Sequence, residues 1–184
     1  MRAANLFAGE RVRLTAIEPG DLPAVARWYR DSDFMRRLDA DIAAPKTEKQ
    51  VAEFIEEQQK SGTGFAFAIR PIDSEDVIGY GALEGILWSQ QVTWLTIGIG
   101  EAAQRGKGYG AEAMRLLLRF AFDELNLRRV QLTVFSYNES AIRLYERLGF
   151  RREGVFREFL QRDGELYDML LYGLLRREWE KQPE

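Results

Sequence analysis

The sequence predicts an α/β fold, in which one mixed α+β sheet of about seven strands packs with four helices. Three observations support this. Strand-like alternation and helical periodicity take turns along the 184 residues. No repeat or low-complexity linker divides the chain. A β-loop-α-β run in its second half requires a crossover between parallel strands. The expected order is β-α-α-β-β-β-α-β-α-β-β, with residues 1–184 forming a single domain.

The chain is expected to open with a strand over residues 10–17, because apolar and polar residues alternate there. A helix follows, and Asp21 is its candidate N-cap. Residues 31–45 read DSDFMRRLDADIAAP and are predicted to form a loop. Thr47 and Gln50 provide the T-x-x-Q of a capping box, which indicates the start of a second helix.

Three strand-like segments come next, and the turn-forming residues between them favour an antiparallel meander. The segments are residues 64–70, 77–87 and 92–100. Apolar residues then recur at helical spacing over residues 113–125, and residues 128–135 alternate as a strand. Because a helix separates this strand from the one before it, the sheet is expected to be partly parallel.

The C-terminal part is predicted to contain one more helix and a β-hairpin. Asn138 or Ser140 begins this helix, and Gly149 lies where a left-handed residue would end it. Two further strand-like runs are joined by an Asp-Gly dipeptide, which is typical of a hairpin turn. The two strand-like runs are residues 154–162 and 165–175, and the Asp-Gly turn is residues 163–164.

Composition excludes several classes of function. The chain contains neither histidine nor cysteine, which removes Ser-His-Asp hydrolases, His-ligated zinc sites, disulfides and cysteine nucleophiles; no metal is expected. The net charge of −3 comes from interspersed charges without a basic stripe, which argues against nucleic acid as a partner. No signal peptide or run of about 20 apolar residues is present. We therefore expect a soluble, cytoplasmic protein without membrane partners.

Residues 104–110 read QRGKGYG, with three alternate glycines beside two cations, and a helical pattern follows. Alternate glycines let backbone amides point inward, and the first amides of a helix are unpaired donors at the positive end of its dipole. This combination is typical of an anion cradle, most naturally for phosphate. The segment lacks the P-loop pattern, and G-x-G-x-x-[GA] matches twice and so discriminates poorly. A flexible turn with incidental charges is the alternative.

A second motif lies about thirty residues further on, where residues 138–150 read NESAIRLYERLGF. Together with R-G-K-G-Y-G, it resembles the GNAT superfamily of acetyl-CoA-dependent N-acetyltransferases, and the expected order of elements agrees with that fold over nearly the whole chain. The closing stretch, residues 153–179, further resembles the subgroup that acetylates the N-termini of ribosomal proteins, and its polyamine- and antibiotic-modifying relatives. The resemblance implies acetyl-CoA and an amine-bearing substrate as partners, and it allows for a homodimer.

The resemblance also implies roles for individual residues. Strand backbone would hydrogen-bond the pantetheine arm of the coenzyme at Ile97, Gly98 and Ile99. The pyrophosphate would be bound by the loop residues Arg105, Gly106, Lys107, Gly108, Tyr109 and Gly110. Asn138 would contact the coenzyme near its acyl end, although it is also a candidate N-cap. Tyr145 would protonate the departing thiolate, and the alternative for this residue is a core aromatic.

The implied reaction is direct attack of a neutral amine on the thioester. Some relatives carry a basic carboxylate on the fourth strand, where this chain has Trp94 and Thr96. Glu84 on the preceding strand is the candidate base, directly or through water, with Glu101 as a second candidate and solvated surface carboxylates as the alternative.

The missing carboxylate bears on the acceptor. An α-amine with a pKa of about 8 is about a tenth neutral at pH 7, whereas an amine with a pKa near 10.4 is almost fully charged. We therefore predict a protein or peptide N-terminal α-amine. A polyamine or aminoglycoside acceptor is the alternative within the enzymes, and a non-catalytic acyl-CoA-binding module is the alternative outside them.

Overall fold

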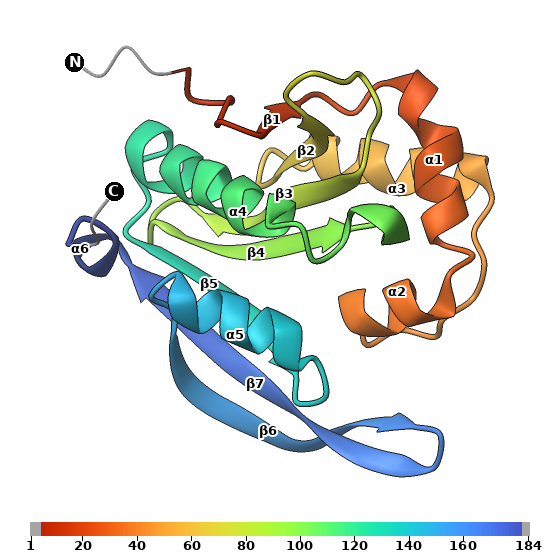
Figure 1. Ribbon diagram of the computed structural model, residues 1–184. Coiled ribbons are helices and arrows are strands. Elements are labelled where there is room, and N and C mark those ends of the chain that lie inside the picture. Colours follow the sequence, from red (N-terminus) through yellow and green to blue (C-terminus); the bar gives the residue numbers. More distant parts are fainter. Residues whose placement is uncertain (1–4, 182–184) are drawn as a thin grey trace.

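A computed structural model describes residues 5–181 and contains a seven-stranded mixed sheet in the order β1-β2-β3-β4-β5-β7-β6 (Figure 1). The strands are β1 Val12–Thr15, β2 Phe65–Pro71, β3 Gly79–Leu87, β4 Val92–Ile99, β5 Arg129–Phe135, β6 Arg151–Arg162 and β7 Glu165–Leu175. Neighbouring strands from β1 to β4 are antiparallel, β4 and β5 are parallel, and β7 is antiparallel to both β5 and β6. The predicted meander and the parallel crossover are both confirmed.

Six α-helices lie within residues 5–181 rather than the four predicted: α1 Leu22–Trp28, α2 Ser32–Leu38, α3 Glu48–Lys60, α4 Tyr109–Arg119, α5 Glu139–Arg147 and α6 Arg176–Trp179. Short 3-10 turns precede α1 and α4, and a π-helical turn, Phe120–Glu124, extends α4. None of these described helices is long and apolar enough to cross a membrane.

Helix α2 lies in the segment predicted to be a loop, so that prediction was wrong. Asp31 caps it, since its Oδ1 accepts hydrogen bonds from the amides of Asp33 and Phe34 at 3.0 and 3.3 Å. Phe34 and Met35 are buried. A helix of seven residues is not stable by propensity alone. Packing of these two apolar side chains against the rest of the protein therefore stabilises α2.

Asp21 lies at the predicted N-cap position but makes no side-chain cap, which corrects its expected role. Its two carboxylate oxygens accept hydrogen bonds from Arg70 of β2 at 2.8 and 2.7 Å, and both side chains are buried. A buried guanidinium needs a counter-charge, so Asp21 joins the start of α1 to the sheet. By contrast, the capping box of Thr47 and Gln50 is confirmed at the start of α3.

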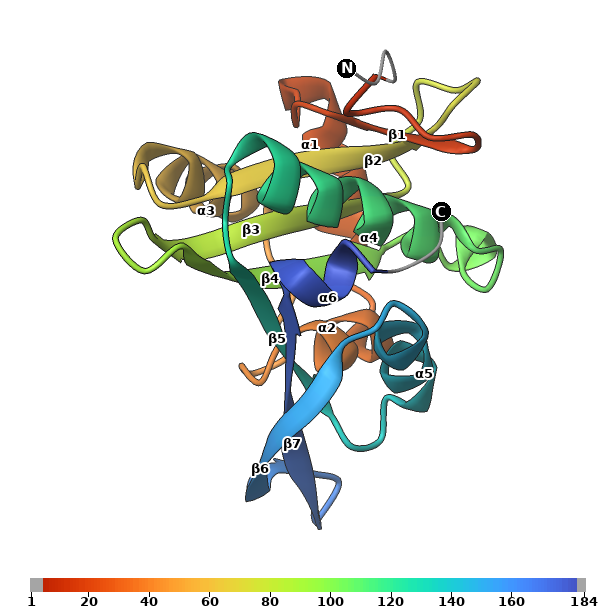
Figure 2. The same cartoon turned by 90° about the vertical axis from the view of Figure 1, so that its left-hand side faces the viewer.

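Two hydrophobic cores cover opposite faces of the sheet. One lies beneath α4 and α5 and includes Leu83, Met114 and Leu132; Figure 2 shows α4 across the face of the sheet toward the viewer. The other is formed by α1, α2 and α3. Adjacent residues Ala68 and Ile69 of β2 belong to different cores, as the alternation of side chains along a strand requires.

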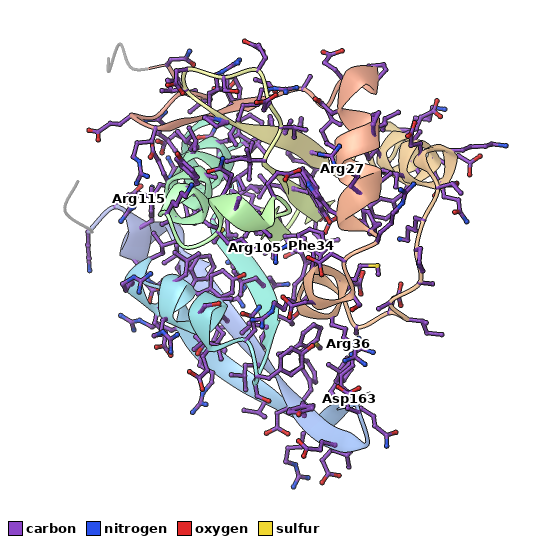
Figure 3. All side chains as sticks on the ribbon, turned by 45° about the vertical axis from the view of Figure 1, so that its right-hand side comes forward. Arg27, Phe34, Arg36, Arg105, Arg115 and Asp163 are labelled. Carbon is purple, nitrogen blue, oxygen red and sulfur yellow. The ribbon has the colours of Figure 1, made fainter. Side chains whose placement is uncertain are left out.

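The β6–β7 hairpin extends beyond the rest of the sheet toward α2 (Figure 1). Its turn is the predicted Asp163-Gly164, with φ angles of 53° and 86°. Asp163 forms a bidentate ion pair with Arg36 of α2 at 2.8 and 2.9 Å (Figure 3). Nearby, Arg162 donates to the carbonyls of the segment after α2, residues 39–41. The C-terminal hairpin and the N-terminal helices are therefore joined on one side of the molecule.

Candidate active site

A cleft forms where β4 and β5 separate. These strands pair only from Val92 to Trp94 of β4 and from Arg129 to Gln131 of β5. Further along, β4 pairs with β3 and β5 pairs with β7. The opening has a volume of about 880 Å³. Backbone groups on this edge of β4 have no strand opposite them in the described part of the chain, so a ligand can bind them as a further strand would.

The cleft brings together all of the predicted site residues except Lys107 and the second candidate base, Glu101. They come from β3, β4, the glycine loop with the start of α4, and α5: Glu84, Ile97, Gly98, Ile99, Arg105, Gly106, Gly108, Tyr109, Gly110, Asn138 and Tyr145. The ammonium of Lys107 instead donates to Gln104 Oε1 at 3.2 Å. Segments that are far apart in the sequence therefore line one cavity.

The glycine loop has the backbone geometry of an anion cradle. Gly106 and Gly108 have φ angles of 75° and 86°, which other residues rarely adopt. The amide of Arg105 bonds the carbonyl of Ala102, and the amide of Glu112 bonds the carbonyl of Gly108. The amides of residues 106–111 make no hydrogen bond within residues 5–181. These donors lie at the positive end of the α4 dipole, so the loop fits a phosphate group.

The side chain of Arg105 holds the loop in place. Its Nε and Nη2 donate to the carbonyls of Ile99 and Gly100, both at 2.9 Å. Its guanidinium pairs with Asp31 at 3.1 Å and lies beside the ring of Phe34 (Figure 3). Burial alone would raise the pKa of Asp31, but hydrogen bonds from the amide of Phe34 and from Arg105 keep it below its ordinary value. Arg105 thus ties the loop to β4 and α2.

Arg11 is a second cation at the loop, and the sequence motifs did not indicate it. Its Nη2 donates to the carbonyl of Lys107 at 2.6 Å, and its guanidinium lies 4.8 Å from the ring centroid of Tyr109. Its amide donates to Glu112 of α4 at 2.9 Å. Since Arg11 precedes Lys107 by 96 positions, only the tertiary structure reveals this contact.

One of the two matches to G-x-G-x-x-[GA] is formed by Gly98, Gly100 and Ala103, and its two glycines allow close packing. A Cβ at Gly98 would lie 3.0 Å from the ring of Phe34, and a Cβ at Gly100 would lie 2.0 Å from the ring of Trp28. Glycine at these positions therefore lets aromatic side chains of α1 and α2 pack against β4. The dinucleotide-like spacing here has a packing cause.

Helix α5 contributes Asn138 and Tyr145. Asn138 is the N-cap residue, but its side chain does not cap the helix; its Oδ1 accepts from Ser140 Oγ at 3.1 Å. The ring of Tyr145 packs 5.9 Å from that of Phe150, and 8% of the residue is exposed. Its hydroxyl has no partner among the described residues. Burial raises the pKa of Tyr145 to about 12, so the phenol stays protonated at any working pH.

Strand β3 contributes Glu84 to the cleft wall. Its Oε2 accepts a hydrogen bond from Thr96 Oγ1 of β4 at 2.9 Å. Tyr29 and Tyr80 also line the cleft near Glu84, and their hydroxyls are 3.3 Å apart. Burial raises the pKa of both phenols, that of Tyr80 most strongly. Glu84 is therefore a carboxylate at the edge of a poorly hydrated wall.

Glu101, the second candidate base, does not line the cleft. Its Oε1 accepts hydrogen bonds from Arg27 and from the indole of Trp28, both at 2.9 Å. These contacts direct the carboxylate toward α1. Among residues 5–181, no cluster of three histidine, cysteine, aspartate or glutamate side chains could hold a metal ion.

Comparison with known proteins identifies relatives of the chain. Residues 11–151 match the family model described as an acetyltransferase (GNAT) domain. The SPbeta prophage-derived N-acetyltransferase YokL of Bacillus subtilis is 32% identical over 97% of both chains. The [ribosomal protein uS5]-alanine N-acetyltransferase of Escherichia coli is 29% identical over 68% of this chain and 64% of its own length.

Solved structures share the fold. The spermidine N-acetyltransferase of Vibrio cholerae, in complex with CoA and spermine, has a TM-score of 0.85 at 22% identity, covering 94% of this chain and 100% of that one. The GNAT-family acetyltransferase of Bacillus anthracis has a TM-score of 0.79 at 24% identity, covering 94% and 99%.

Proposed function

Because the chain belongs to the GNAT acetyltransferase family, and is therefore an acetyl-CoA-dependent N-acetyltransferase, we propose that it acetylates the N-terminal α-amine of a protein or peptide. The observation that carries this proposal is the cleft itself. It unites the anion-binding loop, Tyr145 and Glu84, while β4 supplies Trp94 and Thr96 where a strong strand base would lie. A site whose candidate base lies on β3 rather than on β4 suits an amine that is already partly neutral.

For acetyl-CoA we propose two contact regions. The free amides of residues 106–111 bind the pyrophosphate, since they are unpaired donors at a helix N-terminus. The open edge of β4 at Ile97, Gly98 and Ile99 binds the pantetheine arm, and Asn138 lies close to the acyl end. When bound, the coenzyme supplies the thioester carbon that the amine attacks. No acyl-cysteine intermediate forms, because the chain has no cysteine.

Glu84 accepts the proton of the attacking amine, directly or through water, as the C–N bond forms and the C–S bond breaks. Tyr145 faces the departing sulfur. Full proton transfer from a phenol with a pKa of about 12 to a thiolate whose conjugate acid has a pKa of about 8.5 is uphill by about 5 kcal/mol. Tyr145 therefore stabilises the developing thiolate mainly as a hydrogen-bond donor, and solvent completes its protonation.

Charged side chains of both signs line the cleft and bear on the choice between an α-amine and a polyamine. Arg37 and Lys46 line the cleft, and their charges oppose a polycation. The Escherichia coli relative acetylates a ribosomal-protein alanine, which agrees with the ribosomal-protein subgroup as the finer proposal. Asp39, Asp41 and Glu84 also line the cleft and favour the alternative, a polyamine acceptor like that named for the Vibrio cholerae structure.

The pH dependence separates these acceptors. For a peptide we expect kcat/KM to rise with a slope near one and level off at about pH 8, since only the neutral α-amine attacks. A polyamine acceptor would keep rising toward about pH 10. Thiol release measured between pH 6 and pH 10 tests this, and its absence with every amine would favour a non-catalytic acyl-CoA-binding module.

The Glu84→Gln variant locates the base. Loss of this carboxylate should lower kcat/KM several-fold more at low pH than on the plateau of the pH profile. The reason is that a base matters most where little of the amine is neutral. Glu75→Gln is the control, since Glu75 is exposed and pairs with Arg13 outside the cleft. Equal profiles for wild type and Glu84→Gln would contradict the assignment.

We also propose that residues 1–184 form one acetyltransferase domain. The family match ends at residue 151, but β6 and β7 complete the same sheet. A homodimer stays a prediction; sedimentation of the purified protein tests it.

A further inference from the structure

Lys46 lies in the segment between α2 and α3, and its ammonium lies over two aromatic rings. The nitrogen is 4.6 Å from the ring centroid of Tyr29 and 5.3 Å from that of Phe54. Both distances are typical of cation–π contacts. Lys46 forms no ion pair with a carboxylate in the part of the chain that the structure describes. Its partners there are the faces of the two rings.

The surrounding structure fixes this contact. Thr47, the next residue, caps α3 together with Gln50, and Phe54 lies further along the same helix. The hydroxyl of Tyr29 lies 3.3 Å from that of Tyr80. The two rings and Glu84 also line a small apolar cavity of about 30 Å³. The rings therefore form a preorganised aromatic surface for an organic cation, beside the candidate base.

The same region of the cleft would attract a cationic acceptor. Glu84, Asp39 and Asp41 line the cleft together with the two rings, and the charges of Asp39 and Glu84 act on Tyr29. Carboxylates beside aromatic faces are the chemistry that binds alkylammonium groups. The position on the rings is filled by the chain's own ammonium. A second ammonium of the acceptor would lose these ring contacts and meet a like charge at close range.

We propose that Lys46 determines acceptor specificity: its ammonium occupies the aromatic site that a diamine or polyamine would use for its second charge, and so excludes these acceptors while accepting a monoamine. This inference rests on the proposed α-amine function. A peptide N-terminus presents one ammonium, which becomes neutral near Glu84 and does not compete for the rings.

The test compares Lys46→Met with wild type, because methionine keeps an unbranched apolar chain and removes the charge. We expect kcat/KM for spermidine, measured by thiol release, to rise about tenfold or more, since both the repulsion and the competition for the rings are removed. For a peptide beginning with alanine we expect a much smaller change. Lys46→Arg keeps the charge and should continue to exclude spermidine.

Lys49→Met is the matched control. Lys49 lies on α3, its side chain is 85% exposed, and its ammonium is 3.7 Å from Glu53; it does not line the cleft. The variant loses the same charge from the same region and should match wild type with both acceptors. A spermidine gain in Lys49→Met equal to that in Lys46→Met would show a general charge effect and overturn the proposal.

The experiment distinguishes failure of the proposed role of Lys46 from failure of the proposed α-amine function. If wild type prefers the peptide and a folded Lys46→Met variant with normal acetyl-CoA affinity gains nothing on spermidine, the role of Lys46 is overturned and the proposed function stands. If wild type acetylates spermidine better than the peptide, the α-amine function itself is overturned, and the exclusion by Lys46 with it.

Discussion

Replacing Tyr145 with phenylalanine is expected to lower kcat about 100-fold, while acetyl-CoA affinity and melting temperature stay near their wild-type values. The variant keeps the ring and its contact with Phe150 and removes only the hydroxyl, which has no partner among the described residues. A preorganised hydrogen-bond donor to the charge that develops in the transition state typically contributes about 100-fold or more to kcat. Thiol release under saturating acetyl-CoA, with calorimetric titration of the coenzyme, measures both effects.

Tyr172→Phe is the control for this experiment. Tyr172 is another tyrosine of the same core, 2% exposed, and its hydroxyl donates to Glu146 at 2.9 Å outside the cleft. Its loss should cost about 1 kcal/mol of stability and leave turnover intact. If Tyr145→Phe keeps wild-type turnover in the chemical step, Tyr145 is only a core aromatic.

Gly108→Val is expected to weaken acetyl-CoA binding about 10- to 100-fold without unfolding the protein. Gly108 has a φ of 86°, and a β-branched residue held there costs about 1 to 3 kcal/mol of strain or moves the loop. The added Cβ would also lie 3.0 Å from Arg11 Nη1. Either response disturbs the free amides around it. Gly110 is less sensitive, because a Cβ there meets only Ile99 at 3.7 Å.

Gly62→Val separates strain from binding. Gly62 has a φ of 65° and lies in the turn after α3, away from the cleft. A Cβ added there would meet open space. The Gly62→Val variant should lose about as much stability as Gly108→Val and keep normal affinity for acetyl-CoA in calorimetric titration. Unchanged affinity in a folded Gly108→Val variant would remove the support for the pyrophosphate assignment.

Local signals in the sequence were sufficient for much of the fold. The capping box of Thr47 and Gln50, the Asp163-Gly164 turn and the alternation of the strands depend on residues close together in the chain, and each was confirmed. Helix α2 was missed because a helix of seven residues is too short to be stable alone and depends on the burial of Phe34 and Met35. Asp21 was misread because its partner, Arg70, lies 49 positions away.

The site divides in the same way. The sequence by itself was sufficient to locate the glycine loop and the α5 motif, because positive φ angles and helix starts depend on residues that are close together in the chain. Only the tertiary structure decided that Glu84 bonds Thr96, that Arg105 ties the loop to α2, and that Lys46 lies over Tyr29. These contacts join separate elements. Their geometry depends on how β4 and β5 part and how helices pack on each face, and no short window of sequence contains that information.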